Sequence, residues 1–114
     1  MKTVKTVNIK IDMPSVEEAR KRLADEIKKA KSEGWMVIKL VHGYGSTGVG
    51  GKLRDALRKS LALRRKEGLI KAFLYGERWN IFEEEGRRYL ESCPELRRDH
   101  DLNSQNEGIT LLLL

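Results

Sequence analysis

The segment Leu40-Val41-His42-Gly43-Tyr44-Gly45-Ser46-Thr47-Gly48-Val49-Gly50-Gly51-Lys52-Leu53-Arg54 joins an apolar run to a strongly basic helical pattern. From Gly43 to Gly51, five of nine residues are glycine. Glycine adopts positive φ angles and lets the backbone approach a ligand without a Cβ in the way. A glycine-rich turn that leads into a helix also gathers unpaired N–H groups, which suit a phosphate or another anion. We therefore expect the functional site in this segment.

The residues before this segment predict a strand, a helix and a second strand. Residues 7–11 alternate between apolar and polar side chains, which is the period of a strand with one buried face. Ser15 and Glu18 have the spacing of a capping box, and the helix that follows ends at Gly34. Residues 35–41 are almost continuously apolar, which is typical of a central, buried strand. The first helix has one apolar stripe, made of Val16, Ala19, Leu23, Ile27 and Ala30.

The residues after the glycines predict a second helix, from about Gly50 to Lys66, and a third strand over residues 69–75. One face of this helix is apolar, and the other carries seven bases against one acid, Asp55. The alternation of strands and helices implies parallel strands joined by right-handed crossovers. Residues 109–114 predict a last strand, antiparallel and at or near an edge of the sheet. The apolar face of the second predicted helix consists of Leu53, Leu57 and Leu61.

Residues 76–105 form an excursion between the third and last predicted strands. Residues 81–92 favour a short helix, weakened by Gly86 and ended by Pro94. Residues 95–106 are polar and charged, and we expect a loop there. The apolar anchors of the short helix would be Phe82, Tyr89 and Leu90.

Length and charge set the class of protein. A chain of 114 residues is expected to form one domain. Its formal net charge of +6 makes polyanions the first partners to consider. Cys93 is the only cysteine, so we expect no internal disulfide, no zinc cluster and a half-buried structural thiol. The N-terminus lacks a signal-peptide pattern and no apolar run is long enough to span a membrane, so we expect a cytoplasmic protein.

One face of the predicted sheet offers a second interpretation. If Ile9, Ile38 and Ala72 face the helices, three lysines share the opposite face with three aromatic residues. Such a surface can bind single-stranded nucleic acid by stacking and phosphate contacts. An ordinary solvent face, with the aromatic residues packed under the excursion, is the favoured alternative. The residues concerned are Lys10, Lys39, Lys71, Trp35, Phe73 and Tyr75.

Two familiar glycine-loop motifs fit the segment poorly. A Walker A loop needs Gly-Lys followed by Ser or Thr, but Leu53 follows Gly51-Lys52 and Ser46 stands where the first glycine belongs. Gly43-x-Gly45-x-x-Gly48 matches the dinucleotide fingerprint, but it follows the second strand and no acid ends the next one. We set both nucleotide functions aside.

The stretch from His42 to Arg54 resembles the His-Gly-x-Gly…Thr-Gly…Leu-Arg signature of the Smr (small MutS-related) domain. Val16-Glu17-Glu18-Ala19 and Asn106–Leu111 are similar to the start of the first helix and to the closing strand of that family. The resemblance implies a two-layer α/β sandwich with a β-α-β-α-β core and a C-terminal strand in a mixed sheet. This fold is similar to the C-terminal domain of translation initiation factor three. The resemblance also implies nucleic-acid binding, with DNA nicking or RNA cleavage in some members.

The sequence departs from the family before the first helix. Smr domains typically have Leu-Asp-x-His-Gly there, and the aligned aspartate, histidine and glycine fall on Lys10, Asp12 and Met13. A carboxylate–histidine pair suits general acid–base catalysis on a phosphodiester, and this replacement removes it. If catalysis persists, His42 and Asp12 are its candidate residues, together with a divalent metal. Otherwise we expect no cofactor, and a metal site at Asp99-His100-Asp101 is less expected than a surface loop.

We therefore expect a single Smr-like domain over residues 1–114 that binds RNA or DNA, with the ribosome as one candidate setting and no membrane partner. An endonuclease with altered catalytic residues and a protein-interaction module that uses residues 76–106 are the alternatives. His42 could contact phosphate or hold the loop, while Ser46 and Thr47 could cap the second helix or contact phosphate. The candidate binding residues are His42, Gly43, Gly45, Ser46, Thr47, Gly48, Gly50, Lys52, Arg54 and Arg58.

Overall fold

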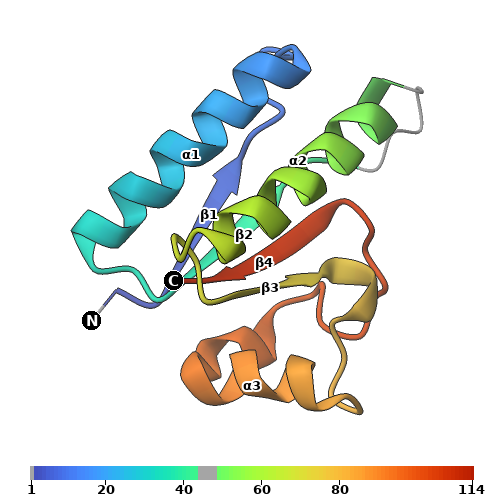
Figure 1. Ribbon diagram of the computed structural model, residues 1–114. Coiled ribbons are helices and arrows are strands. Elements are labelled where there is room, and N and C mark those ends of the chain that lie inside the picture. The colour runs from blue at the N-terminus through green and yellow to red at the C-terminus, as the bar shows by residue number, and fades with distance from the viewer. Residues whose placement is uncertain (1, 44–48) are drawn as a thin grey trace.

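The computed structural model describes residues 2–43 and 49–114. In these residues, a mixed four-stranded sheet and two long helices form the predicted two-layer α/β sandwich, and a third, shorter α-helix adds to it (Figure 1). Among the described residues, no helix combines the length and the apolar composition needed to cross a bilayer. In chain order the elements are β1 (Val4–Asn8), α1 (Val16–Glu33), β2 (Val37–Val41), α2 (Val49–Lys66), β3 (Ala72–Tyr75), the short 3-10 helix η1 (Gly76–Arg78), α3 (Glu84–Ser92), a second 3-10 helix η2 (Pro94–Arg98) and β4 (Ile109–Leu113).

The sheet has the order β1-β2-β4-β3. β1 and β2 are parallel, whereas β4 runs antiparallel to both of its neighbours, β2 and β3. β4 is antiparallel and near an edge of the sheet, as predicted, but it is an interior strand and not the edge strand itself. Its residues explain this position, since all five are buried and a strand buried on both faces is stable only between neighbours. The outer strands are β1 and β3.

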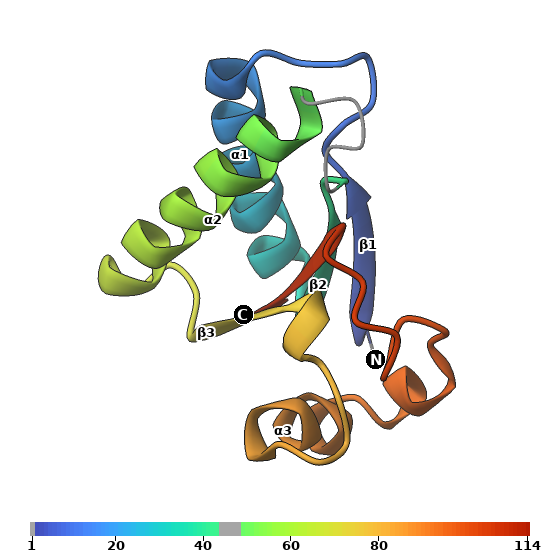
Figure 2. The same cartoon turned by 90° about the vertical axis from the view of Figure 1, so that its right-hand side faces the viewer.

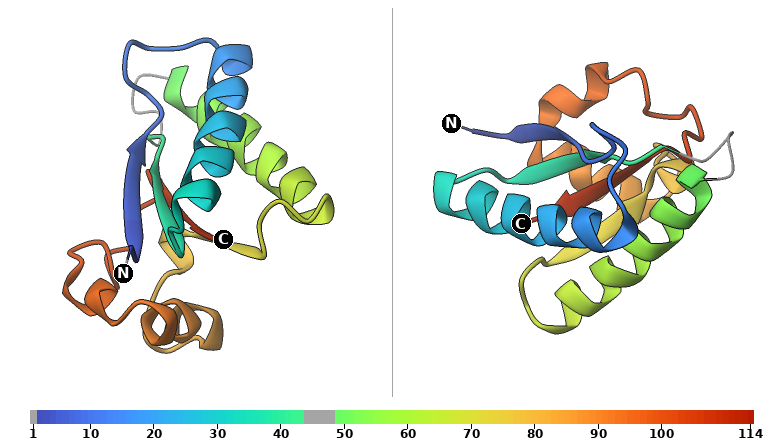
Figure 3. Two further views of the ribbon diagram at one scale, coloured as in Figure 1. Left: turned by 90° about the vertical axis from the view of Figure 1, so that its left-hand side faces the viewer. Right: turned by 90° about the horizontal axis from the view of Figure 1, so that it is seen from above.

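Helices α1 and α2 cover one face of the sheet, as expected from their apolar stripes (Figure 3). Ser15 caps α1, since its hydroxyl accepts a hydrogen bond from the Glu18 backbone N–H at 3.1 Å and donates one to the Glu18 carboxylate. Gly34 ends α1 with a φ of 84°. The predicted N-cap and helix end are confirmed, and the Glu18 carboxylate bonds the Ser15 hydroxyl instead of the Ser15 backbone N–H of a full capping box. The core on this face consists of Ala19, Leu23, Ile27, Ala30, Leu53, Leu57 and Leu61 from the helices, Val7, Ile38, Leu40 and Leu112 from the sheet, and Ile9 and Ile70 next to its strands.

Residues 76–105 cover the other face of the sheet (Figure 2). Tyr89 and Leu90 are buried there as predicted, but Phe82 is 82% exposed and anchors nothing. Gly86 is required in α3, because a Cβ on it would clash with the Asn80 carbonyl oxygen. The predicted loop over residues 95–106 is partly wrong, since it includes most of η2. Cys93 is fully buried rather than half-buried, and burial raises the pKa of its thiol.

The first strand lies earlier in the chain than the alternation predicts. It spans Val4–Asn8, and beyond Asn8 the backbone N–H of Ile9 extends its pairing by a bond to the Val41 carbonyl oxygen. Ile11 belongs to the turn before α1 and is 56% exposed. The alternation over residues 7–11 therefore correctly predicted that Val7 and Ile9 are buried, and it was wrong for Ile11.

The proposed face of lysines and aromatic residues does not form. Phe73 and Trp35 pack against the core beneath α1 and α2, whereas Ala72 packs on the opposite side, beneath α3. Lys39 is 7% exposed and faces the excursion, not solvent. Because β3 is apolar at all four positions, its sequence does not indicate which side chains face which layer. The alternative of aromatic residues packed under the excursion is wrong for Phe73 as well.

Candidate nucleic-acid interface

His42 and Gly43 form a tight turn at the end of β2. The backbone N–H groups of both residues donate to the carbonyl oxygen of Gly108, each at 3.0 Å. Gly43 has a φ of 76°, a conformation that residues with a Cβ rarely adopt. The chain that enters β4 thus fixes the backbone at the start of the glycine-rich segment.

The His42 side chain is 1% exposed and both of its ring nitrogens are hydrogen-bonded. Nδ1 lies 2.7 Å from the Gly43 carbonyl oxygen, which can only accept, so Nδ1 carries the proton. Nε2 then accepts from the Thr110 hydroxyl at 2.9 Å. Burial, with the positive charges of Arg58 and Arg54, lowers the pKa of His42 to about 4. At neutral pH the imidazole is therefore uncharged and holds the turn.

Arg58 continues this network from α2. Its Nε donates to the Thr110 hydroxyl at 3.4 Å, and its two Nη groups donate to the Glu77 carboxylate at 2.8 and 2.6 Å. Its guanidinium also lies 4.0 Å from the centre of the Tyr75 ring. Burial alone would raise the pKa of Glu77, but the hydrogen bonds from Arg58 outweigh it and lower that pKa. Arg58 thereby links α2, β3, η1 and β4.

The remaining cations near the turn differ in whether they contact an acid. Arg54 contacts Asp55 at 3.3 Å and Glu107 at 3.7 Å. Lys52 is exposed in the first turn of α2, a turn that contains no acid. The Lys10 side chain passes over Gly43, with its Cδ 3.6 Å from where a Cβ of Gly43 would lie. This end of α2 is therefore basic, although Arg54 and Arg58 are already paired with acids.

The other predicted site residues lie apart from His42 or outside the described residues. Gly45, Ser46, Thr47 and Gly48 lie outside them, and Gly50 belongs to the first turn of α2. Asp12 is exposed in the turn before α1, at a φ of 65°, and the ring of His42 bonds to other residues. Within the described part of the chain, no hydrogen bond joins His42 to Asp12.

Three residues of this network were missed from the sequence: Glu77, Thr110 and Gly108. Glu77 and Arg58 are 19 residues apart, so no local spacing pairs them. Thr110 offered a signal, because it is the one polar side chain in an otherwise apolar strand and is completely buried. A buried hydroxyl needs a partner, which identifies such a threonine as part of a polar network.

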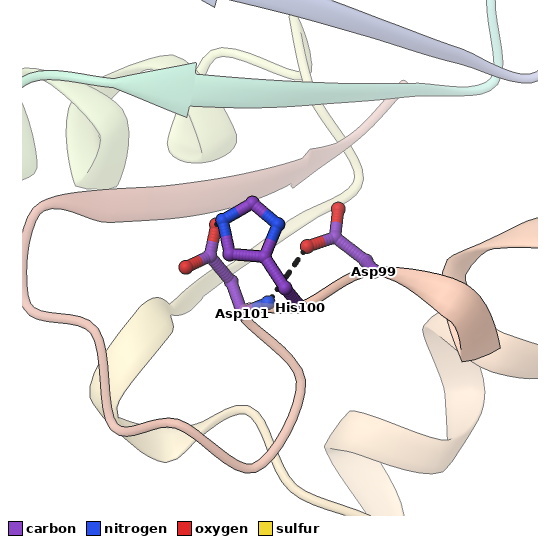
Figure 4. A group of neighbouring side chains, drawn as sticks. All are labelled: Asp99, His100 and Asp101. Carbon is purple, nitrogen blue, oxygen red and sulfur yellow. Dashed lines mark hydrogen bonds and ion pairs between the residues drawn. The ribbon is translucent and has the colours of Figure 1, made fainter.

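The group Asp99-His100-Asp101 lies on the opposite face of the sheet (Figure 4). Its ligand atoms lie within 4.8 Å of one another, but both carboxylates already bind the ammonium of Lys39. Burial alone would lower the pKa of Lys39, but its bonds to Asp101 and Asp99 outweigh burial and raise it. A metal ion would have to displace this buried ammonium, and the His100 side chain is 88% exposed. The geometry is that of an ion-pair network.

Comparison with known proteins identifies a family. No curated protein and no solved structure matches the chain significantly. The family model described as Smr domain matches residues 11–114, which include the His42–Gly43 turn and the 76–105 segment but not β1. Smr domains are associated with nucleic-acid binding or with nicking endonuclease activity. Because the match spans nearly the whole sequence, this chain belongs to the Smr domain family.

Proposed function

We propose that this chain binds RNA or DNA by gripping the sugar–phosphate backbone between the His42–Gly43 turn and the start of α2. Membership of the Smr family and the net charge of +6 both support a polyanionic partner. Contacts to the backbone carry little sequence information, so binding should be salt-sensitive and show little sequence preference.

The observation that carries this proposal is the hydrogen-bonded frame around the turn. Two N–H bonds to Gly108 and the bond from Thr110 to His42 fix the backbone where the glycine-rich segment begins. The segment then leads into α2, an 18-residue helix without an acid in its first turn. A helix N-terminus attracts anions, because its N–H groups are unpaired and its dipole is positive there.

The basic residues divide into contacts and supports. Lys52 is exposed and Arg54 is half-buried, and both lie in the first two turns of α2, from which they can reach a phosphate. The guanidinium of Arg58 is hydrogen-bonded to Glu77 and Thr110, so Arg58 holds the residues around the turn in place. His42, buried and neutral, supports the turn in the same way. The proposed contact set is completed by Gly43, Gly45, Ser46, Thr47, Gly48 and Gly50.

The geometry favours binding over cleavage. A general base must reach the proton that it removes, but both ring nitrogens of His42 are bonded within the protein. Asp12, the proposed acidic partner, is exposed in a separate turn. We therefore propose that the protein binds an oligonucleotide and does not cleave it. Cleavage by the wild-type protein with Mg²⁺ or Mn²⁺, lost in His42→Ala, would contradict this part of the proposal.

Fluorescence anisotropy tests the binding proposal. Labelled single-stranded RNA, single-stranded DNA and duplex DNA are titrated at about 50 and about 200 mM salt. The variant Lys52→Ala/Arg54→Ala removes two proposed contacts, and Lys28→Ala/Lys29→Ala on α1 is the control with the same change of charge. We expect the first variant to bind at least about fivefold more weakly at low salt and the control to bind like wild type. No affinity of the wild type for any of the three nucleic acids at low salt would refute the proposal.

A further inference from the structure

A groove runs along the outer edge of β3, away from the His42–Gly43 turn. β3 is the end strand of the sheet, and in the described structure only β4 pairs with it. Figure 2 shows β3 at this margin, between α2 on one side and α3 on the other. Two adjoining hollows of about 220 and 160 Å³ lie there and share Arg65, Phe73 and Glu85 in their linings. We call them together the β3 groove.

Unpaired positive charge lines the β3 groove. Four cations contribute to it against one acid, Glu85. Among the described residues, the side chains of Arg65, Lys71 and Arg88 form neither hydrogen bonds nor ion pairs, and all three are exposed. Arg78, the fourth cation, has a single long contact with Glu83 at 3.8 Å. These charges are free to bind an external anion.

Two guanidinium groups, those of Arg65 and Arg58, lie over aromatic rings of β3. Phe73 and Tyr75 project to the same side of β3, with ring centres 5.6 Å apart. The Arg65 guanidinium lies 5.2 Å from the Phe73 centre, and the Arg58 guanidinium covers Tyr75. A guanidinium that stacks on a ring keeps its N–H groups available at its edge. Nucleobases stack on exposed aromatic rings and on arginine planes.

Tyr89 also lines one of these hollows. Its side chain is 2% exposed, and within the described structure its hydroxyl has no hydrogen-bond partner. A buried hydroxyl without a partner is unfavourable, so most such groups in proteins are satisfied by the protein, by water or by a ligand. The same hollow is lined by Lys71 and Arg88.

We propose that the β3 groove binds a single-stranded stretch of nucleic acid, with phosphates on Arg65, Lys71 and Arg88 and a base against the Arg65 plane. The inference rests on the proposed function and adds the preferred form of the ligand and a second contact surface. Both hollows are too small for a duplex, and a base can stack on a protein surface only where it is unpaired, as in a single strand. An acidic peptide is the competing occupant, because it would also pair with the cations. It is less favoured because it has no bases to stack.

Two double variants of the full chain test the β3 groove. Arg65→Ala/Arg88→Ala removes charge and stacking, and Arg65→Lys/Arg88→Lys keeps the charge but loses the plane. The probes are fluorescein-labelled oligothymidine and oligouridine of about 16 nucleotides, a duplex of the same length, and polyglutamate. We expect the alanine variant to bind single strands at least about fivefold more weakly and to lower the salt slope by about 1.4, the value for two phosphates. The lysine variant should lie between it and wild type, and duplex binding should change less than twofold.

The outcomes separate this inference from the proposed function. If wild type binds none of the nucleic acids, both fail. If wild type binds and Lys52→Ala/Arg54→Ala weakens binding, but Arg65→Ala/Arg88→Ala does not affect single strands, only the β3 groove is refuted. Equal losses for polyglutamate and for single strands would also refute it, since they would indicate a general anion surface. Circular dichroism of each variant verifies the fold, and Lys28→Ala/Lys29→Ala remains the charge-matched control.

Discussion

The cations of this protein divide into two groups with opposite surroundings. Lys39, Arg54 and Arg58 each contact acids from residues 77–107, and their side chains are only 9%, 22% and 10% exposed. We call these the paired cations. Arg65, Lys71 and Arg88, on the β3 groove, are exposed and contact no acid in the described structure. The first group holds the molecule together, and the second is available to a ligand.

The difference shows why a count of charges along a helix is a poor guide to a binding surface. Helix α2 carries seven bases and one acid, but acids distant in the sequence contact two of those bases, Arg54 and Arg58. Glu77, Glu107 and the Asp99–Asp101 pair all come from the 76–107 stretch. That stretch is therefore joined to the core by ion pairs as well as by apolar packing.

The largest expected effect is the loss of stability when Lys39 is replaced. Lys39→Met leaves Asp99 and Asp101 partly buried without their cation, which should lower the free energy of unfolding by about 3–5 kcal/mol. Urea unfolding followed by circular dichroism measures it. Lys71→Met, an exposed groove cation, is the matched control and should change stability by less than about 0.5 kcal/mol. A loss below about 1 kcal/mol in Lys39→Met would break the distinction between the two groups.

The next effect is the pH dependence that His42 contributes. Its pKa is about 4 in the folded protein against an ordinary 6.5, so between these values the unfolded chain binds a proton that the native state does not. Stability should therefore fall as the pH drops from about 6.5 to about 4, by about 2–4 kcal/mol in total, and this contribution should level off below pH 4.

His42→Gln isolates this contribution, because glutamine can hydrogen-bond but does not titrate. Carboxylates with a lowered pKa, such as Glu77 and Asp101, also make the folded protein less stable in acid, but their contribution is present in both the wild type and the variant. Urea unfolding across this pH range should give a flatter profile for the variant. Parallel profiles would show that His42 is not the titrating group.

A smaller effect should follow from freeing one paired cation. Glu107→Gln removes the distant acid that contacts Arg54, so nucleic-acid binding at low salt should tighten by about two- to threefold. Asp25→Asn, an exposed change on α1 with the same charge, is the control for net charge and should alter affinity less. If both variants bind equally tightly, pairing with Glu107 does not limit Arg54. Anisotropy titration measures both.

The smallest expected effect is at Tyr89. Because its hydroxyl has no partner in the described structure, Tyr89→Phe should change the free energy of unfolding by less than about 0.5 kcal/mol. Thr110→Val removes a buried hydroxyl that has two partners and should cost about 1–3 kcal/mol. A loss above 1 kcal/mol in Tyr89→Phe would mean that this hydroxyl is already satisfied, and would remove it from the β3 groove proposal.

Much of the fold could be predicted because its signals are local. The cap at Ser15, the end of α1 at Gly34 and the apolar faces of both long helices depend on residues a few positions apart. The orientation of β3 and the interior position of β4 depend on which strands meet, and an all-apolar strand such as Ala72–Tyr75 does not encode its facing layer. Gly86 shows the same limit, since the close approach of Asn80 that requires glycine is visible only in three dimensions.

The candidate site divides in the same way. The position of His42 at the end of a strand followed from the apolar run before it, and Gly43 followed from the glycine pattern. Its partners did not, because Thr110 is 68 residues away and Glu77 reaches the site only through Arg58. Sequence therefore located the turn, but it did not reveal that the histidine is enclosed.

The interior position of β4 has a consequence for folding order. During synthesis, β2 and β3 emerge long before residues 109–113, yet every ladder bond of β3 is made to β4. The β1–β2 pair and the packing of α1 on it can form early, but the other half of the sheet must wait for this last strand. Until then two apolar strand edges remain exposed, and such edges are prone to pair with other chains. A nascent or truncated chain that lacks β4 should therefore aggregate rather than adopt a smaller stable fold.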